Sequence, residues 1–475
     1  MFYNDNTRNI LDNPILGTDS YKLSHWLQYP VGMDGMFSYI ESRGGGFDRS
    51  VMFGLQPILL DFFTRRITRE DVAMAKEIAA AHGEPFNEAG FLRIVDTHEG
   101  FWPLRIRALP EGSVVPASVP VVTVESTDPE LAWAVSYVET ILLQLWYPVT
   151  VATLSWSVRQ VIAGFLAETS DDVAGQLPFK LHDFGYRGTS SPQTAARGGL
   201  AHLLSFRGTD TLAAVLAARA YYDEPMAGYS IPAAEHSTIT SWGPEAEVDA
   251  YRNMIRQFGK PGAVFACVSD STDIYRAVDK LWGEVLRQDV IDSGATLVVR
   301  PDSGDPVEVV LRCAQLLERH FGADTNGKGY KVLRNVRLIQ GDGINDRTVR
   351  DILASLKSNA YSADNIAFGM GGGLLQQVNR DTLRFAMKCS AIRVDGVWRD
   401  VWKNPVTDPG KASKRGRMTV LRNRDTGELK TALIEEGIWH DTTRFEDAMA
   451  TVWENGTLLK RYALDEVRST LQASC

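Results

Sequence analysis

From about residue 179 onward, short apolar runs alternate with longer segments of helical periodicity. The apolar runs begin near residues 180, 203, 229, 264, 296, 336 and 366 and end in Gly, Asp, Arg or His. Apolar residues recur at positions i, i+3, i+4 and i+7 in the segments between them, at 211–222, 245–258, 273–287, 306–321 and 346–358. This alternation predicts a parallel sheet, and seven units over about 200 residues favour an irregular (β/α) barrel over an open sheet.

The regions on either side of these units have a different pattern. Residues 100–125 alternate apolar and polar positions and contain four prolines, as β-structure with turns does. Residues 386–463 again contain short strand-like runs separated by turn residues. We therefore expect an α/β protein with two domains. One is a (β/α) barrel at 146–385, and the other is a β-containing α/β domain formed by 1–145 together with 386–475.

Composition and charge exclude several classes of protein. With 475 residues, 44% hydrophobic and 23% charged, the chain has ordinary globular composition and a length that suits two or three domains. Its net charge of −9 argues against a general nucleic-acid-binding surface, so any phosphate site must be a local basic cluster. The four cysteines lie far apart with no C-x-x-C pair, which argues against a zinc site or a disulfide framework.

The N-terminal segment lacks a basic region followed by an apolar core, so we expect no signal peptide. The most apolar stretch, 140–156, contains Gln144 and Pro148 and is not expected to span a membrane. Together with the unpaired cysteines, these features favour the reducing cytoplasm.

Polar residues follow the predicted strands directly, and in a barrel the carboxyl ends of the strands form the face that carries active sites. Arg300 offers a planar fork for phosphate or carboxylate. Asp302 has the oxygen ligands that suit Mg²⁺ or sugar hydroxyls. Gly341 precedes Asp342 and lets a ligand approach both backbone and carboxylate. Taken alone, Arg300 and Asp302 would also fit an ion pair that caps a turn. Gly341 and Asp342, taken alone, would also fit a plain turn.

Other strand ends carry aromatic, acidic and imidazole groups. Phe184, near Arg187, is placed to stack on a flat ring or simply to fill the core. Asp210 suits either a helix N-cap or an acceptor for a ligand amide. His236 follows one strand and Asp270 follows another, so a structural histidine and an Asp-oriented catalytic imidazole both remain open.

The segment IAFGMGGGLLQ (366–376) places four glycines in five residues between a strand and a helix start. A tight turn would explain them, and so would backbone N–H groups at Gly371 and Gly372 that approach an anion. Downstream stand Arg380, Lys388, Lys403 and the basic run 411–417, which begins with Lys411. Next to phosphate-type loops, this patch favours a polyphosphate clamp over a solvated loop. The whole set predicts a phosphorylated sugar, a flat heterocycle and a nucleotide as ligands.

The chain resembles the nicotinamide phosphoribosyltransferases, which have the type II phosphoribosyltransferase fold, along nearly its whole length. The resemblance lies in collinear motifs: TDSYKLSHWLQYP, FGLQ, KLHDFGYRG, GTDT, GYSIPAAEHSTITSWG, VSDSTDIY, RPDSGDP, QGDGI, AFGMGGGLLQ and MKCS. It implies an enzyme that makes nicotinamide mononucleotide and pyrophosphate from nicotinamide and phosphoribosyl pyrophosphate (PRPP) with Mg²⁺. It also implies a homodimer with active sites at the subunit interface, and optional ATP hydrolysis.

The same resemblance implies residue roles. Phe184 and the partner subunit's Tyr21 would sandwich nicotinamide, Asp210 would accept its carboxamide N–H, and Asp19 would line the same pocket from the partner. The remaining roles concern the sugar, the phosphates and ATP: Arg187 and Arg300 at the base and phosphate, Asp302 and Asp342 at the ribose, Gly341, Gly371 and Gly372 at the phosphate, Arg43, Arg380, Lys388, Lys403 and Lys411 around the pyrophosphate, and a phosphorylated His236 partnered by Asp270.

Three positions depart from the family pattern: Phe179 replaces the common Tyr, Met370 a small polar residue and Ala266 a Ser. They bear on fine affinity and on inhibitor-type ligands. Three alternative functions stay open: a nicotinate phosphoribosyltransferase, a non-catalytic signalling or binding homologue, and an unrelated phosphate-binding barrel lyase or isomerase.

Overall fold

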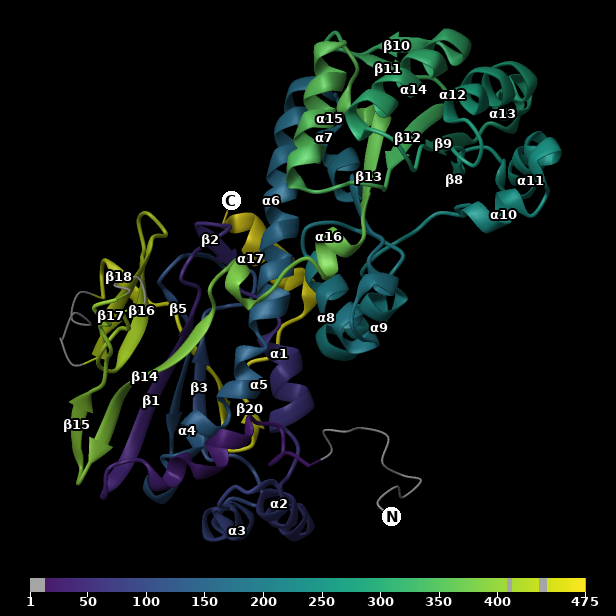
Figure 1. The fold of residues 1–475 in the computed structure, drawn as a ribbon. Helices are drawn as coiled ribbons and strands as arrows, with labels where there is room; N and C mark the ends of the chain where they lie inside the picture. The colour runs from purple at the N-terminus through teal and green to yellow at the C-terminus, as the bar shows by residue number, and fades with distance from the viewer. Residues whose placement is uncertain (1–12, 408–411, 435–441, 475) are drawn as a thin grey trace. The chain divides into compact units, whose positions relative to one another are not determined.

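The computed structural model describes residues 13–407, 412–434 and 442–474. The chain divides into two compact units (Figure 1). Unit 1 comprises Met1–Thr150, Tyr221–Asp223 and Asn379–Cys475, and unit 2 comprises Val151–Ala220 and Glu224–Val378. Unit 1 thus contains both ends of the chain, and the predicted fold class, a barrel-like domain plus a β-containing domain built from both ends, is confirmed.

Unit 1 is built on an antiparallel sheet that, within the described residues, has seven strands in the order β15-β14-β1-β5-β3-β19-β20. The first strand of the chain lies between strands from distant parts of the sequence, since Tyr39 of β1 pairs with Lys388 of β14 and with Thr123 of β5. The strands of this sheet are β1 (Met33–Glu41), β3 (Leu104–Ala108), β5 (Pro120–Ser126), β14 (Ala386–Val394), β15 (Val397–Asp400), β19 (Ala450–Glu454) and β20 (Thr457–Leu458).

Smaller elements complete unit 1. Its core centres on large aromatic side chains, among them Phe63, Trp102 and Trp453, which are wholly buried. The smaller sheets are β2 (Arg49–Val51) with β4 (Val114–Pro116), and β17 (Leu429–Leu433), β16 (Met418–Asn423) and β18 (Phe445–Asp447). The helices are α1 (Leu55–Ile58), α2 (Arg69–His82), α3 (Glu88–Thr97), α4 (Ala134–Tyr137), α5 (Glu139–Leu143) and α17 (Leu464–Ala473).

Unit 2 is built on a parallel sheet with the strand order β7-β6-β13-β12-β9-β8. Its strands are β6 (Leu181–Asp183), β7 (Gly208–Thr209), β8 (Val264–Val268), β9 (Thr296–Arg300), β12 (Val336–Gln340) and β13 (Ile366–Met370). A short antiparallel hairpin, β10 (Ala323–Thr325) and β11 (Lys331–Leu333), precedes β12. Strands thus start close to the predicted positions 180, 264, 296, 336 and 366.

The extended segment 229–234 curls this sheet into an irregular barrel. Tyr229 forms a parallel bridge with Gly208 at one edge of the sheet, and Ala233 forms one with Ala266 at the other edge. The segment is not the regular strand that its apolar character predicts, because Pro232 has no N–H and contributes only its carbonyl, which accepts from the N–H of Ala266 at 2.9 Å.

The predicted strand start near residue 203 is wrong, because residues 203–206 are not in a strand. These residues follow α8 (Pro192–His202) as helical turns, in which the N–H of Leu203 donates to the carbonyl of Gly199. They are apolar because all four side chains are buried beneath the helix end, and the strand at this point is only Gly208–Thr209.

Helices connect the strands of unit 2 at the predicted segments, and α14 packs on β12 (Figure 1). The prediction at 306–321 is confirmed by α14 (Pro306–Phe321), whose first turn is capped by the Asp305 carboxylate. The prediction at 346–358 is confirmed by α15 (Asp346–Ser358). Other helices are α6 (Trp146–Thr169), α7 (Val173–Gln176), α9 (Leu212–Tyr222), α10 (His236–Thr240), α11 (Glu247–Phe258), α12 (Ile274–Arg276), the π-helix η7 (Ala277–Val285), α13 (Arg287–Ser293) and α16 (Gly372–Leu375).

One helical stretch, Glu139–Thr169, is long and apolar enough to cross a membrane by length and composition. More than half of its most apolar part, 56%, is buried inside the protein. A mostly buried core helix meets the same criteria, so this stretch is weak evidence for a membrane span.

Candidate active site

The carboxyl ends of the unit 2 strands surround a cavity of about 890 Å³, the strand-end pocket. It is lined by residues from five strand ends and from the closing segment. The sequence-predicted residues among its lining are Phe184, Arg187, Asp210, His236, Arg300, Asp302, Gly341, Asp342 and Gly371. The structure therefore brings together, on one face of the barrel, side chains that are up to 187 positions apart in the sequence (371 − 184).

Phe184 directly follows β6 and sits half-buried in the pocket wall. Its backbone N–H donates to the carbonyl of Met370 at 3.0 Å, which ties it to the neighbouring strand β13. Its ring lies against Gly369, where a Cβ would come within 2.0 Å of a ring carbon. Below the ring, Ala266, Val298 and Ile339 form a small buried apolar cluster.

Asp210 follows the two-residue strand β7 and is exposed to solvent. Its backbone N–H donates to the carbonyl of Asp183 at 3.0 Å, so the loop that carries it is attached to β6. The Ser230 hydroxyl donates to Oδ1 of Asp210 and orients the carboxylate. Sequence reasoning missed Ser230, although it lies in the closing segment, whose polar residues follow an apolar run in the same way as those of the strands.

Arg300 and Asp302 form a two-bond ion pair at the end of β9. Nε of Arg300 donates to Oδ1 at 3.0 Å and Nη2 donates to Oδ2 at 2.5 Å. Burial opposes the charge on Arg300, but the hydrogen bonds and charge of Asp302, and then the charges of Asp270 and Asp210, raise its pKa. The guanidinium therefore stays cationic in a partly buried site among three carboxylates.

His236 is the first residue of α10, and Nε2 of its imidazole lies 2.8 Å from Oδ1 of Asp270. The Asp270 side chain is only 6% exposed, whereas that of His236 is 47% exposed. The buried carboxylate thus orients an accessible imidazole and favours the tautomer with its proton on Nε2, which leaves the lone pair on Nδ1.

The glycines around the end of β13 differ in whether the structure has room for a side chain. At Gly369 the Phe184 ring leaves no room, and a Cβ on Gly373 would lie 3.1 Å from the carbonyl of Ile344. At Gly372, by contrast, a Cβ would meet nothing within 4 Å, and neither Gly371 nor Gly372 has a positive φ. Neither packing nor backbone conformation therefore requires glycine at 372. This residue starts the short helix α16, and the first N–H groups of a helix have no acceptor within the helix.

The other predicted residues belong to unit 1. Tyr21 lies in the 3₁₀-helix Ser20–Leu27 and is 55% exposed. Asp19 precedes it and accepts a hydrogen bond from the Thr140 hydroxyl at 2.6 Å. These two residues stand on an accessible surface of unit 1.

The predicted basic cluster also lies in unit 1. Burial lowers the pKa of Lys388, and the nearby charges of Arg43, Lys403 and Arg380 lower it further. These four cations therefore share one electrostatic environment, and Nη2 of Arg43 is buried without a hydrogen-bond partner in the described part of the chain. Lys411 lies outside the described residues.

A second residue that sequence reasoning missed is Asp183, the last residue of β6, which is completely buried beneath the pocket. Burial raises its pKa to about 6. Its position between two residues of the HDFG motif gives no sign of burial, because a carboxylate at a strand end normally faces solvent.

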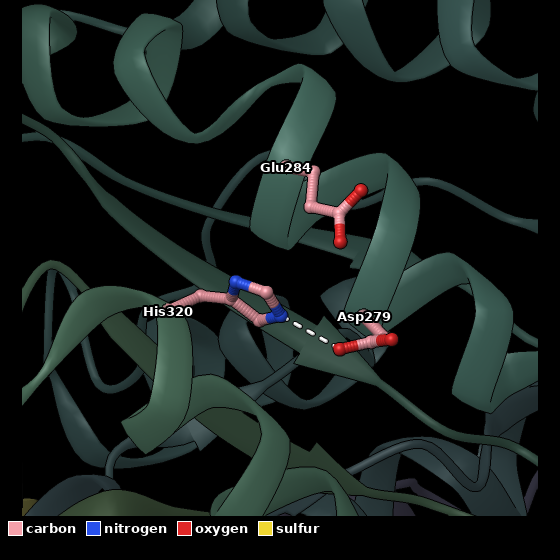
Figure 2. Close-up of side chains that lie close together, drawn as sticks. All are labelled: Asp279, Glu284 and His320. Carbon is pink, nitrogen blue, oxygen red and sulfur yellow. Dashed lines mark hydrogen bonds and ion pairs between the residues drawn. The ribbon is translucent and has the colours of Figure 1, made fainter.

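The strand-end pocket suits a metal ion only if the substrate supplies part of the ligands. Mg²⁺ is usually held by one or two carboxylates plus substrate phosphates. Asp342 can supply one such carboxylate, whereas both oxygens of Asp302 already accept from Arg300 and would have to be shared with the ion. Among the described residues, three ligand groups converge only at Asp279, Glu284 and His320, on the helices outside the barrel (Figure 2).

That outer group is already neutralised. His320 Nε2 lies 2.7 Å from Asp279 Oδ1 (Figure 2), and Lys280 pairs with Asp279 at 3.6 Å and with Glu284 at 2.6 Å. Arg319 adds a further ion pair with Asp279 at 3.5 Å. With both carboxylates engaged by cations, this group carries no argument for a metal.

Of the three positions that depart from the family pattern, Ala266 contributes directly to the pocket lining. Met370 is buried beside the glycine loop. Phe179 is 42% exposed, and its ring makes a tilted contact with the ring of Tyr229. Ala266 gives the floor of the pocket an apolar methyl group.

Comparison with known proteins shows which family the chain belongs to. The model of the nicotinate phosphoribosyltransferase (NAPRTase) family matches residues 179–457, and the model of the nicotinamide phosphoribosyltransferase N-terminal domain matches residues 13–106. A nicotinamide phosphoribosyltransferase of Xanthomonas campestris pv. campestris is 60% identical over 464 residues, covering 98% of this chain and 99% of that protein. A nicotinamide phosphoribosyltransferase of Acinetobacter baylyi is 32% identical and covers 97% of each chain.

Solved structures agree in fold. A nicotinate-nucleotide pyrophosphorylase from Pyrococcus furiosus has a TM-score of 0.60 at 16% identity, covering 99% of this chain and 98% of that one. The human nicotinic acid phosphoribosyltransferase has a TM-score of 0.58 at 17% identity, covering 96% and 93%. A family model that spans more than half of the sequence, together with relatives matched end to end, shows that this chain belongs to the nicotinate phosphoribosyltransferase family, as its resemblance to the nicotinamide phosphoribosyltransferases predicts.

Proposed function

We propose that this chain transfers the phosphoribosyl group of PRPP to nicotinamide, giving nicotinamide mononucleotide and pyrophosphate, a step of NAD salvage. The observation that carries the proposal is the 60% identity, over 98% of the chain, to a nicotinamide phosphoribosyltransferase. The strand-end pocket supports it, because an aromatic ring, a carboxylate acceptor and an Arg–Asp pair share one cavity.

In this proposal the pyridine ring stacks on Phe184, and Asp210 accepts a hydrogen bond from the carboxamide. A nicotinate carboxylate at the same place would meet a like charge, which disfavours the acid in a partly dry site. The partner subunit's Tyr21 covers the other face of the ring, and its Asp19 lines the pocket, so the working enzyme is a homodimer. The exposure of Tyr21 supports a role at an interface.

The reaction needs no protein nucleophile. The bond between C1′ of the ribose and the pyrophosphate oxygen breaks, while the pyridine nitrogen forms a bond to the same carbon from the opposite side. Positive charge develops on the sugar, and Asp302 and Asp342 stabilise it. The product pyridinium is a cation between aromatic faces, an interaction of roughly 0.5–2 kcal/mol per face.

Negative charge develops on the departing pyrophosphate. Backbone N–H groups at Gly341, Gly371 and Gly372 hold phosphate oxygens, and the open space around Gly372 supports this role. The basic cluster of unit 1 receives the leaving anion in this proposal: Arg43, Arg380, Lys388, Lys403 and Lys411. Bound Mg²⁺ supplies further charge neutralisation on the pyrophosphate.

We also propose that ATP stimulates the reaction through His236. With its Nε2 proton held by Asp270, Nδ1 attacks the terminal phosphorus of ATP and the bond to the ADP oxygen breaks. Water later hydrolyses the phosphohistidine. The supporting observation is the 2.8 Å contact between an exposed imidazole and a buried carboxylate. The expected location of the enzyme is the cytoplasm.

The first test is an assay of the purified protein with nicotinamide, PRPP and Mg²⁺, with and without ATP, and with nicotinate in parallel. We expect nicotinamide mononucleotide from nicotinamide and a higher rate with ATP. Product from nicotinate alone would reassign the chain to the acid-specific enzymes of the family. No product from either base would leave a binding role as the remaining function.

A further inference from the structure

Asp183 is a buried carboxylate that the reaction described above does not use. It ends β6, its exposure is 0%, and it lies directly before the stacking residue Phe184. A carboxylate costs free energy when it leaves water, so its retention at this place calls for a compensating role. Its hydrogen bonds identify that role.

Two loops of the strand-end pocket are attached to this one residue. Oδ1 of Asp183 accepts from the N–H of Gly185 at 2.7 Å, in the turn that carries Phe184 and Arg187. The backbone carbonyl of Asp183 accepts from the N–H of Asp210 at 3.0 Å, in the neighbouring loop. The stacking ring and the amide-reading carboxylate are therefore both held from Asp183.

We propose that Asp183 is a positioning residue for nicotinamide: its carboxylate holds the Phe184–Arg187 turn, and its carbonyl holds the Asp210 loop. The position of the aromatic ring relative to the Asp210 carboxylate is thereby fixed from one residue. This inference rests on the proposed roles of Phe184 and Asp210.

The turn is held at two successive N–H groups. That of Phe184 donates to the carbonyl of Met370 in β13, and that of Gly185 donates to the Asp183 carboxylate. Gly185 admits no larger residue, because a Cβ there would lie 2.7 Å from Leu375 and 3.0 Å from the carbonyl of Gly371. A hydrogen bond to a charged carboxylate is stronger than one between neutral groups, so the bond from Gly185 to Asp183 is the firmer of the two.

The surroundings of the second carboxylate oxygen show that this group is not placed for stability. Oδ2 is buried and faces Gly199 of α8, whose Cβ would come within 2.9 Å of it. Burial raises the pKa of Asp183 more than the hydrogen bonds from Gly185, Thr211 and Thr209 lower it. The charged carboxylate therefore destabilises the fold, and its benefit lies in the pocket above it.

The test compares steady-state KM values for nicotinamide and for PRPP in wild type and four variants. Asp183→Ala removes the acceptor, Asp183→Val removes it while filling the space, and Asp183→Asn retains an acceptor oxygen for Gly185. Phe184→Ala tests the proposed stacking role. Asp364→Ala is the matched control, because Asp364 also has a buried carboxylate oxygen and stands before β13, at the opposite end of that strand from the pocket.

We expect D183A and D183V to raise the nicotinamide KM roughly tenfold, the size of one lost hydrogen bond to a charged group, with the PRPP KM within about twofold. D183N should restore the nicotinamide KM to within about threefold of wild type, and D364A should leave it unchanged. Valine keeps the site filled and removes a buried charge, so at least one acceptor-free variant should fold.

Two outcomes would overturn the inference while leaving the proposed function intact. In the first, F184A raises the nicotinamide KM but D183A and D183V do not. In the second, both substrates lose affinity equally, or D183N is as defective as D183V, which would indicate general disruption. If F184A itself leaves the nicotinamide KM unchanged, the stacking role fails, and the positioning role falls with it.

Discussion

The ring of Phe184 occupies the place where a side chain on Gly369 would be, since a Cβ there would lie 2.0 Å from Cε2 of the ring. Strand β13 therefore supplies a flat backbone against which the aromatic ring rests, and the N–H of Phe184 donates to the next carbonyl of that strand, Met370. Glycine at 369 shapes the pocket, whereas glycine at 372, three residues later, has open space around it.

The two glycines should respond differently to the same substitution. Gly369→Ala forces the Phe184 ring to move inside a buried site, and overpacking of this kind costs about 1–3 kcal/mol of unfolding free energy. Gly372→Ala should change stability by less than about 0.5 kcal/mol, yet it places a methyl group where the phosphate of PRPP is proposed to bind.

Urea denaturation and steady-state kinetics distinguish the two effects. We expect G369A to lose stability and to raise the nicotinamide KM, and G372A to keep its stability and to raise the PRPP KM. A stable G372A enzyme with a wild-type PRPP KM would show that the phosphate does not approach this part of the loop.

Much of unit 2 can be predicted from the sequence because its helices and strands have strong, regular periods. The segments at 306–321 and 346–358 match α14 and α15 because each carries an apolar face and a capping residue at its start. The failure at 203–206 has a physical cause: four buried residues beneath a helix end look the same as a strand when only hydrophobicity is considered.

Some residues of the candidate site can be predicted from the sequence and others cannot. The sequence predicts that Arg300 and His236 lie at one pocket, because each follows an apolar run directly, and both line the strand-end pocket. Ser230 cannot be predicted, because its role comes from a contact with Asp210, 20 positions earlier in the chain, and such pairing has no local sequence signal. Asp183 cannot either: its bond to Gly185 is local, but the sequence does not show that its carboxylate is buried.

The selectivity for amide over acid should depend on Asp210. Asp210→Asn removes the negative charge that disfavours nicotinate, so the ratio of kcat/KM for nicotinamide to that for nicotinate should fall roughly tenfold to hundredfold. Ser230→Ala, which frees the carboxylate to rotate but keeps its charge, should lower kcat/KM for nicotinamide without admitting nicotinate. Competition between the two bases at equal concentration measures this ratio directly, and an unchanged ratio in D210N would assign selectivity to another group.

The coupling to ATP should depend on His236 and its carboxylate partner. In His236→Ala, the ratio of rates with and without ATP should fall to about one, whatever the rate without ATP. Asp270→Asn should weaken the stimulation, because the amide no longer stabilises the imidazolium character that develops on phosphoryl transfer. Acid-labile phosphate on the wild-type protein, absent from H236A, is the accompanying signature. Stimulation that persists in H236A would place ATP at another site.

The buried carboxyl of Asp183 should make the free energy of unfolding fall as the pH rises. Burial raises its pKa in the folded protein to about 6, from an ordinary value of 3.8. The folded state therefore binds this proton more tightly than the unfolded state does. The associated stability is fully present below about pH 4 and is lost as the pH rises through about 6.

Comparison with Asp183→Asn isolates this effect, because the variant lacks the titrating carboxyl and keeps every other ionisable group, including Asp210, whose charge also acts on Asp183. With these two pKa values, wild type should lose roughly 1 kcal/mol of unfolding free energy relative to D183N between pH 5 and pH 8. The midpoints of urea denaturation at pH 5, 6, 7 and 8 measure the difference. If it stays constant over this range, the carboxyl ionises at an ordinary pKa, and its hydrogen bonds compensate fully for its burial. If it grows with pH as expected, the enzyme keeps a destabilising charge beneath its pocket at neutral pH, which a role in holding the Phe184 turn explains and a purely structural role does not.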